Sequence, residues 1–358
     1  MQNLFSKLKV VDLSTVLAGP SVATFFTELG AEVVKIENPK TNGDVTRSWK
    51  LSDEDPKSKV SAYFSSVNYK KKYLWLDLGN TENKTQILEL IKNADIVISN
   101  FKKGDDKKFG LTTEIISALN PGIIQARIKG YSSDEERVAY DVVLQAESGF
   151  MYMNGTPESG PIKMPVALID VLAAHQLKEG ILCALLQKEI TGKGSVVECS
   201  LEKSALASLV NQATNYLMGG IIPQAQGSLH PNIAPYGEIF YCKDQKPLVL
   251  AIGSDKQFTL LCEVLEKPSL FLDTRFTNNQ SRVQNRKALY SEMSDIFLKK
   301  DRAAWTQVFN EKKIPAGAVL SMEDVMKGTI AQSMIREEKI EEIKTKRMSS
   351  IAFSIIEN

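Results

Sequence analysis

The feature that most limits how this chain can fold is a regular alternation of short apolar strands with longer helical segments. The predicted strands cover residues 9–13, 31–37, 73–78, 95–99, 123–128 and 195–199. The predicted helices run from near Pro20 to Gly30, over 81–93, over 112–119, and from near Asp170 into a long apolar stretch. Strands that alternate with helices usually pair in parallel, because each crossover helix returns the chain to the same edge of the sheet. The sequence therefore predicts an α/β fold with a mostly parallel sheet.

The texture of the sequence changes near residue 220. A Gly/Pro/Gln-rich passage at 219–228 precedes a paired-strand pattern over 237–253, whose polar turn lies at Lys243–Lys246. Charged helices are predicted after it, over 254–265, 283–300 and 302–311. At roughly 150 residues per domain, a chain of 358 residues suits two domains. The predicted divisions are a large domain (1–220), a smaller α+β domain (221–320) and a Lys/Glu-rich C-terminal segment with little apolar periodicity (321–358).

The charge of the chain is balanced, with 44 Lys and Arg residues against 43 Asp and Glu residues and a net charge of +1. This balance does not favour a nucleic-acid-binding surface. The N-terminal stretch lacks a signal-peptide core, and no apolar run approaches the ~18 residues of a membrane span. We therefore expect a cytoplasmic protein with no nucleic-acid partner and no membrane partner.

Cysteine and histidine offer little for a metal site. No C-x-x-C pair occurs, and buried reduced thiols are expected at Cys183, Cys199, Cys242 and Cys262. The two histidines, His175 and His230, lack ligand spacing to a second metal-binding group. We expect each imidazole to pack or to cap, and we predict no metal.

A dinucleotide site is the first functional class to test, because a glycine-containing turn follows the first strand and Glu37 ends the second. Such a site needs G-x-G-x-x-G, which lets the backbone approach a pyrophosphate. The turn offers only Gly19. The sequence therefore argues against dinucleotide binding, and it favours Glu37 as a solvent-exposed strand end over a ribose ligand.

Asp170 is the strongest candidate for chemistry. It follows the apolar run V-A-L-I and precedes a helical pattern, so it is expected at a helix start. Aspartate is a preferred N-cap, and capping is the favoured structural role at such a position. The same end of a helix is expected to keep the carboxylate ionised, and an ionised carboxylate can attack an activated acyl group. The sequence leaves both roles open.

Basic residues recur in the predicted loops, and most are expected to be solvated charge. The set is Lys40, Arg47, Lys70, Lys71, Lys72, Lys102, Lys103, Lys107, Lys108 and Lys129. In an open parallel sheet, ligands bind beyond the carboxyl ends of the strands, where several of these loops would converge. A phosphate-bearing ligand would suit them, with Lys72 and Lys129 as the favoured contacts.

Several stretches, in order along the chain, together resemble the family III CoA-transferases. The stretches are V-V-D-L-S-T-V-L-A-G-P, L-G-A-E-V-V-K-I-E-N-P with G-D-V-T-R, N-Y-K-K-K-Y-L-W-L-D-L, A-D-I-V-I-S-N-F, Y-D-V-V-L-Q-A-E-S-G and T-G-K-G-S-V-V-E-C-S. The likeness spans about residues 8–265, with H-P-N-I-A-P-Y and G-S-D-K-Q-F in the second domain. The formyl-CoA transferases, the carnitine CoA-transferases and the alpha-methylacyl-CoA racemases belong to this superfamily.

The resemblance implies a Rossmann-like large domain that binds coenzyme A, a small domain, and an interlocked homodimer. It implies a reaction between an acyl-CoA donor and a carboxylate acceptor, with Asp170 as the nucleophile and with aspartyl anhydride and aspartyl-CoA thioester intermediates. Coenzyme A enters as the substrate thioester, and no metal is implied. The family's last segment returns to the large domain. Here 321–358 is expected to do so in abbreviated form, because it ends I-A-F-S-I-I-E-N without a G-E-H-T-like phrase.

The resemblance also implies a set of binding residues. The positions that match the family's coenzyme A contacts and pocket are Val16, Leu17, Lys72, Asn100, Lys108 and Lys129. Lys108 stands where family members often carry arginine, whose planar fork lysine cannot reproduce. Leu17 stands where the formyl-CoA transferases carry glutamine, which argues against that substrate.

Two alternatives remain at this stage. A racemase of the same superfamily needs a histidine in a G-H-D phrase and an acid in a Y-E-C phrase, where this chain has Tyr140 and Tyr241. Tyrosine, with a reference pKa of about 10, is a poor general base near neutrality, so a transferase is favoured and Tyr140 is assigned to the substrate pocket. The other alternative is a non-catalytic homologue that binds coenzyme A, which the altered C-terminus would suit.

Overall fold

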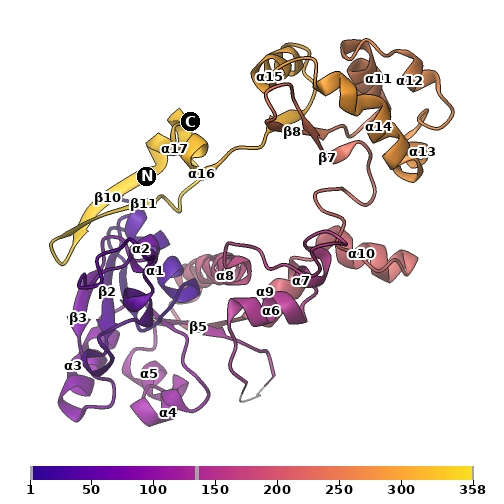
Figure 1. The fold of residues 1–358 in the computed structure, drawn as a ribbon. Helices are drawn as coiled ribbons and strands as arrows, with labels where there is room; N and C mark the ends of the chain where they lie inside the picture. The colour runs from indigo at the N-terminus through magenta and orange to yellow at the C-terminus, as the bar shows by residue number, and fades with distance from the viewer. Residues whose placement is uncertain (1–2, 134–136, 357–358) are drawn as a thin grey trace. The chain divides into compact units, whose positions relative to one another are not determined.

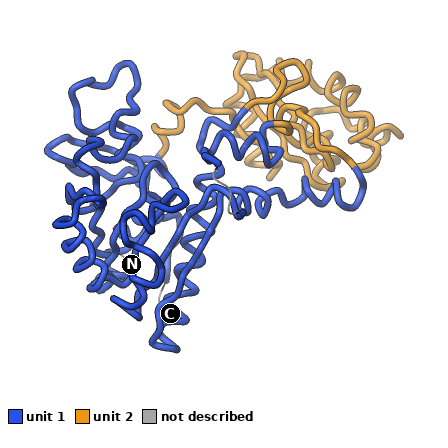
Figure 2. The backbone as a smooth tube through the Cα atoms, turned by 90° about the horizontal axis from the view of Figure 1, so that it is seen from below, with its two compact units in different colours: residues 1–151, 163–220, 329–358 blue, residues 152–162, 221–328 orange. Residues whose placement is uncertain are grey.

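The computed structural model describes residues 3–133 and 137–356. They form two compact units that differ from simple consecutive halves (Figure 2). Unit 1 comprises residues 1–151, 163–220 and 329–358, and unit 2 comprises 152–162 and 221–328. The chain thus leaves unit 1 twice and returns to it. In the sequence, 152–162 gave no sign of separating from the large domain.

Unit 1 is built on a six-stranded parallel sheet with the order β3-β2-β1-β4-β5-β6. The strands are β1 (Lys9–Asp12), β2 (Glu32–Glu37), β3 (Lys72–Trp75), β4 (Ile96–Ser99), β5 (Ile124–Lys129) and β6 (Ser195–Ser200). In the centre, Val10 pairs with both Val33 and Ile96. The predicted α/β class with a mostly parallel sheet is confirmed.

Helices cover both faces of this sheet. The helices of unit 1 are α1 (Ala18–Glu28), α2 (Ala62–Ser66), α3 (Thr81–Lys92), α4 (Asp105–Phe109), α5 (Thr113–Leu119), α6 (Asp141–Glu147), α8 (Leu168–Thr191), α9 (Leu201–Ala207), α10 (Val210–Gly219) and α17 (Thr329–Met334). The short helix α7 (Phe150–Met153) crosses the boundary between the units. Two 3-10 turns, η1 (Pro39–Thr41) and η2 (Val45–Ser48), also belong to unit 1. One face packs against α1 and α8, where Phe26 and Ile181 are buried, and the other packs against α3 and α5. Strands buried on both faces read as continuous apolar runs, which is why the sequence located them.

Unit 2 has an antiparallel sheet and its own core. Its elements are β7 (Tyr236–Tyr241), β8 (Pro247–Ala251), β9 (Ala316–Ala318), α11 (Asp255–Val264), α12 (Ser269–Leu272), α13 (Asn279–Gln284), α14 (Arg286–Phe297), α15 (Arg302–Glu311) and α16 (Met322–Met326). The predicted strand pair is β7 and β8, which are antiparallel. The single helix predicted over 283–300 is instead two helices that meet at Asn285.

The C-terminal segment forms a hairpin that the sequence did not reveal. Strands β10 (Ile335–Ile340) and β11 (Ile343–Met348) pair antiparallel and pack on α2 in unit 1 (Figure 1). Ile340 is buried with Val60 and Phe64 in a small apolar cluster. The turn residues Glu341 and Glu342 have φ values of 48° and 67°. Such turns favour asparagine and glycine, so two glutamates gave no sign of a hairpin.

Two expectations for single residue types need correction. Cys183 is exposed and Cys199 is only half-buried, whereas Cys242 and Cys262 are buried as predicted; all four cysteines are free thiols. His175 is exposed on α8 and does not pack, whereas His230 accepts a hydrogen bond from the Asn232 backbone N–H at 3.1 Å. Within the described residues, no helix is both long and apolar enough to cross a membrane, and no cluster of His, Cys, Asp and Glu side chains could hold a metal.

Candidate active site

The candidate site lies at the carboxyl ends of the strands in unit 1. The loop 14–17 follows β1, Asp44 follows β2, and Asn100 follows β4. Helices α1 and α8 begin at this same edge, because each runs antiparallel to the strands that it connects. Asp170 is the third residue of α8. The topology therefore brings loop backbone, helix starts and a carboxylate to one edge of the sheet.

Asp170 is buried, with 8% of its surface exposed. Its burial, together with the nearby charge of Asp141, raises the pKa of its carboxyl to about 7. We expected the helix start to keep the Asp170 carboxyl ionised. That expectation was wrong, because the pKa of this carboxyl is raised and not held at its ordinary value. Desolvation and a like charge both disfavour the ionised form, and here they outweigh the helix dipole.

The cap of α8 is supplied by Asp141 and not by Asp170. The Oδ1 atom of Asp141 accepts hydrogen bonds from the backbone N–H groups of Ile169 at 2.7 Å and Asp170 at 3.4 Å. The N-cap residue, Ala167, makes no side-chain cap bond. Gln145, fully buried, donates to the Asp141 carboxylate at 2.7 Å and so orients it. The Asp170 carboxylate is consequently not used for the capping role that the sequence favoured.

Tyr63, on α2, lies within electrostatic range of these carboxylates. Burial, followed by the charges of Asp170, Asp141 and Asp44, raises the pKa of its hydroxyl to about 12. The rings of Tyr63 and Trp49 pack nearly perpendicular to each other, with centroids 5.1 Å apart. Tyr63 therefore remains a hydrogen-bond donor at all ordinary pH values. Sequence reasoning missed this residue, because a tyrosine in V-S-A-Y-F carries no distinctive signal.

The loop after β1 has a left-handed residue, Val16, with a φ of 73°. For a β-branched residue this conformation costs about 1–3 kcal/mol, so the surroundings must impose it. The Val16 N–H donates to both carboxylate oxygens of Asp44, at 3.3 and 3.1 Å. Asn100 accepts from the Thr15 N–H at 3.0 Å and donates to the Thr15 carbonyl at 2.9 Å. Lys35 donates to the Ser14 carbonyl at 2.6 Å.

Gly19 lies in α1 and allows this loop to pack tightly. A Cβ atom at Gly19 would lie 2.3 Å from the Ser14 side chain, so only glycine fits. The glycine that the sequence placed in the turn thus serves a close approach between helix and loop.

A buried charge network lies beneath the loop. The Lys35 ammonium is 3.3 Å from Asp44 and 3.8 Å from Asp12, and the Lys71 ammonium is 2.9 Å from Asp12. Burial opposes ionisation of Asp12, yet the two lysine charges lower its pKa. Burial lowers the pKa of Lys71 to about 8. Lys71 therefore belongs to the interior and not to the solvated loop charges among which the sequence placed it.

Glu37 is buried, with 3% of its surface exposed, and it is not the exposed strand end that we expected. The Arg47 Nε–H donates to both of its carboxylate oxygens, at 3.0 and 3.1 Å. The Arg47 guanidinium lies 4.0 Å from the centre of the Phe64 ring. An arginine ten residues further along the chain explains the burial, and a strand pattern alone does not reveal such a partner.

The predicted basic contacts are dispersed. The Lys72 ammonium pairs with Glu32 at 2.6 Å, near the amino ends of the strands and away from the other predicted residues. Lys129, at the end of β5, pairs with Glu198 at 2.8 Å. Lys108 lies on α4, close enough to Asp77 for its charge to contribute to lowering the pKa of that carboxyl.

A second lysine, Lys40, adds positive charge near Lys108 and Asp77. The Lys40 ammonium lies 2.6 Å from Asp77, and this hydrogen bond is the main cause of the lowered Asp77 pKa. Lys40 is 76% exposed, so its ammonium is accessible from solvent. Lys40 thus pairs with Asp77 beyond the end of β3, and the Lys108 charge acts on the same carboxylate from a greater distance.

The remaining predicted residues lie at the starts of α1 and α6. Leu17 is the N-cap residue of α1 and is half-buried beside Val16. Tyr140 is the N-cap residue of α6, directly before Asp141, and is 53% exposed. The structure therefore brings Val16, Leu17 and Asn100 together, and it places Tyr140 next to the group that caps the Asp170 helix.

Comparison with known proteins identifies the family. Residues 5–355 match the model of CoA-transferase family III. The chain is 35% identical to a succinyl-CoA:glutarate CoA-transferase of Mus musculus, over 89% of this chain and 72% of that protein. It is 33% identical to an acetyl-CoA:oxalate CoA-transferase of Acetobacter aceti, over 92% of this chain and 85% of that protein.

A solved structure agrees with these relatives. The crystal structure of a CAIB/BAIF family protein from Brucella suis has a TM-score of 0.83 to this chain at 32% sequence identity, and it covers 99% of this chain and 93% of that one. The resemblance on which the sequence analysis rested is confirmed. The protein belongs to CoA-transferase family III.

Proposed function

We propose that this protein is an acyl-CoA:carboxylate CoA-transferase with Asp170 as its nucleophile. The observation that carries the proposal is a buried carboxyl in the first turn of α8 with a pKa of about 7. Such a group is ionised in a substantial fraction of molecules at neutral pH, and it is poorly solvated. Both properties suit attack on a thioester carbonyl.

The reaction divides into acyl transfers at one carboxylate. An oxygen of Asp170 attacks the thioester carbonyl of the donor, and the C–S bond breaks to release the coenzyme A thiolate and leave a mixed anhydride. The thiolate then attacks the Asp170 carbonyl of that anhydride, which releases the donor acid and forms an aspartyl-CoA thioester. The acceptor carboxylate repeats these steps in reverse and regenerates Asp170.

Two neighbours have roles in this scheme. Asp141 fixes the start of α8 and raises the pKa of Asp170. Tyr63 keeps its proton and is available to donate a hydrogen bond to an oxygen that gains charge during attack. The names of the similar transferases pair a short acyl-CoA with a dicarboxylate, and we propose a dicarboxylate acceptor here.

We propose that coenzyme A lies along the carboxyl edge of the sheet in unit 1. The loop of Val16 and Leu17 with Asn100 borders the acyl end. Lys40 and Lys108 are assigned to the phosphates, because ammonium groups neutralise phosphate charge and the charges of both lysines act on Asp77. We propose Lys129 as a further contact to coenzyme A. We do not propose Lys72, because the Lys72 ammonium lies toward the amino ends of the strands.

We also propose an interlocked homodimer. The α10 helix has no buried residue, and Leu217 and Met218 are 78% and 85% exposed. On α8, an exposed apolar stripe comprises Leu182, Leu186 and Ile190 at four-residue spacing. Exposed apolar surface of this extent marks an interaction face, and the family resemblance makes a second copy the proposed occupant.

The test combines a donor-by-acceptor screen with trapping of the intermediate. Succinyl-CoA and acetyl-CoA are incubated with glutarate, oxalate and other carboxylates, and CoA esters are followed by mass spectrometry. Hydroxylamine added with the donor alone should modify Asp170 and inactivate the enzyme. Asp170→Ala should abolish both exchange and labelling, while Asp295→Ala, an exposed carboxylate of unit 2, should leave both unchanged.

Other outcomes would identify the alternatives. Wild-type turnover in Asp170→Ala would show that the nucleophile is assigned wrongly. Deuterium incorporation at the alpha carbon of a 2-methylacyl-CoA, without any acceptor, would indicate a racemase. Binding of CoA esters without exchange across the whole panel would indicate a non-catalytic homologue.

A further inference from the structure

Val16, in the loop after β1, has a strained backbone. A β-branched residue with a φ of 73° is held away from its preferred conformations, and such strain persists only where neighbouring groups impose it. Thr15, beside it, is exposed, and Val16 and Leu17 are half-buried. The loop is thus anchored from beneath, while Thr15 remains open to solvent.

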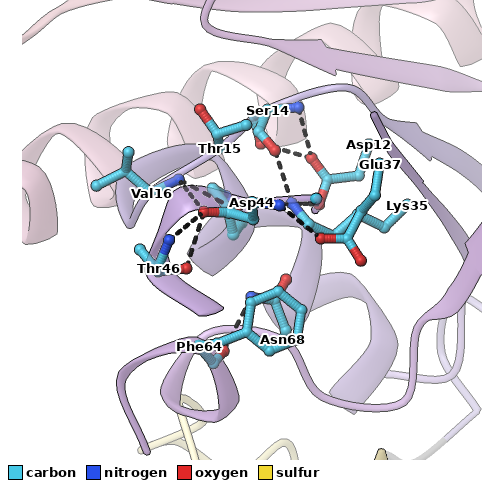
Figure 3. Close-up of polar contacts among 12 residues, drawn as sticks. Asp12, Ser14, Thr15, Val16, Lys35, Glu37, Asp44, Thr46, Phe64 and Asn68 are labelled. Carbon is cyan, nitrogen blue, oxygen red and sulfur yellow. Dashed lines mark hydrogen bonds and ion pairs between the residues drawn. The ribbon is translucent and has the colours of Figure 1, made fainter. Parts of the chain in front are cut away.

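Asp44 is the group that meets the strained peptide directly. It is 2% exposed, and both of its oxygens accept the Val16 N–H. Asp44 is itself fixed on three sides (Figure 3). Its carboxylate accepts the Thr46 N–H at 3.1 Å and the Thr46 hydroxyl at 2.8 Å, the Lys35 ammonium lies at 3.3 Å, and its own N–H donates to Glu37 at 2.9 Å.

We propose that Asp44 is a positioning residue for coenzyme A binding, which holds Val16 left-handed and so fixes the path of residues 15–17 at the edge of the site. The inference rests on the proposed function for the identity of the ligand. Asp44 is not a catalytic residue, because it lies beneath the loop and acts through the Val16 N–H.

This role predicts an effect on binding more than on chemistry. Without Asp44, Val16 is free to return to a negative φ. The loop then occupies several conformations, and only some of them bind the ligand. The apparent affinity for a ligand then falls by the fraction of molecules in the competent conformation. Molecules that have bound substrate retain Asp170 and its cap, so turnover at saturation is largely preserved.

The experiment is a double-mutant cycle read by coenzyme A binding. Asp44→Ala should raise the calorimetric Kd for coenzyme A, and the KM for the acyl-CoA donor, at least tenfold, with kcat within about threefold of wild type. Glycine adopts positive φ without strain, so Val16→Gly should lessen the need for Asp44. The Kd of the double variant should lie within about threefold of that of Val16→Gly alone.

Two controls separate this role from general stabilisation. Thr46→Val removes one hydrogen bond to Asp44 but leaves the Val16 contact, so it should lower Tm without changing the Kd. Glu266→Gly replaces another left-handed residue, in unit 2, and should not rescue Asp44→Ala. If Asp44→Ala does not fold, Asn100→Ala releases the loop from its other side without leaving a buried charge, and Val16→Gly should rescue that variant as well.

The failures of the two proposals can be told apart. An unchanged Kd in Asp44→Ala, or a double variant no better than Asp44→Ala, would overturn the positioning role. Hydrogen exchange needs no ligand: the amides of residues 15–18 should exchange faster in Asp44→Ala, and unchanged exchange would also overturn it. Normal coenzyme A binding with no transfer to any acceptor would contradict the proposed reaction while leaving this inference intact.

Discussion

At the scale of single residues, two buried aspartates of unit 1 show how environment divides one side chain into two roles. Asp12 is surrounded by Lys35 and Lys71, whose charges lower its pKa against the effect of burial. Asp170 has burial and the Asp141 charge, and both raise its pKa. The first carboxylate is held ionised by its lysine partners, whereas the second has a raised pKa, which suits the proposed role as nucleophile.

The raised pKa of Asp170 predicts the pH dependence of the reaction. In the proposed reaction the attacking group is the ionised form of Asp170, whose fraction falls about tenfold per pH unit below a pKa of about 7. With saturating acceptor, kcat/KM for the donor should therefore rise up to about pH 7 and be constant above it. A profile that is flat between pH 5 and 8 would contradict an ionising Asp170.

The Asp141 neighbour provides a sharper version of this test. Asp141→Asn keeps an oxygen to accept the Ile169 N–H but removes the like charge, so the midpoint of the pH profile should move to lower pH. Asp141→Ala should show the same shift and should also lose about 1 kcal/mol of stability, because the cap is gone. An unmoved midpoint in both variants would mean that the charge of Asp141 does not act on Asp170.

The raised pKa of Asp170 also predicts that this carboxyl lowers the stability of the folded protein at neutral pH. A carboxyl whose pKa is higher in the folded than in the unfolded state makes stability fall as pH rises from about 4 to about 7. Asp170→Asn removes that cost. Its free energy of unfolding at pH 8 should exceed that of wild type by about 1–3 kcal/mol, and the difference should nearly vanish near pH 4. Urea titrations at the two pH values measure it.

Sequence reasoning found Asp170 but not its surroundings. Its position before a helical pattern was readable, whereas its cap comes from Asp141, far away in the chain. Glu37 was misjudged for the same reason, since its partner Arg47 lies beyond a turn whose path the sequence does not determine. Asp44 and Asp141 were visible only as letters in family phrases. Residue types and local periods are encoded locally, but pKa values depend on which distant groups folding brings near.

At the scale of elements, the prediction was accurate where one strand or helix carries its own signal. The strands β1, β2, β4 and β5 lie within about two residues of the predicted ranges, because buried parallel strands are rich in apolar residues. The β10–β11 hairpin was missed, because its turn holds two glutamates and because one of its attachments is an ion pair between residues far apart in the chain. Arg347 pairs with Glu28 at 2.6 Å with both side chains buried, and it stacks on Tyr69.

The contribution of this hairpin's ion pairs to stability can be measured by replacing two adjacent residues, Arg347 and Lys346. Arg347→Met leaves Glu28 buried without its cation, and it should lower the free energy of unfolding by about 3 kcal/mol. Lys346→Met removes a pair with Glu337 that is exposed on both sides, and it should change stability by at most about 0.5 kcal/mol. Equal Tm values for the two variants would show that the hairpin does not depend on the buried pair.

At the scale of the whole molecule, the proposed interlocked dimer has a property that ordinary dimers lack. The mass in solution should be twice 39.7 kDa and should not fall on dilution, since interlocked chains separate only by unfolding. Tagged and untagged copies mixed in the folded state should form no mixed dimers, whereas copies unfolded and refolded together should do so. Mixed dimers that form without denaturant would contradict interlocking.

The return of residues 329–358 to unit 1 has a consequence for how the protein is made on the ribosome. The Glu28 and Arg47 side chains are synthesised early, but their partners Arg347 and Glu341 follow only after all of unit 2. At roughly 5–20 residues per second, the nascent chain must wait many seconds for them. During that interval α2 lacks the apolar cover of the hairpin, so the growing chain presents a surface that chaperones can recognise and the finished protein does not.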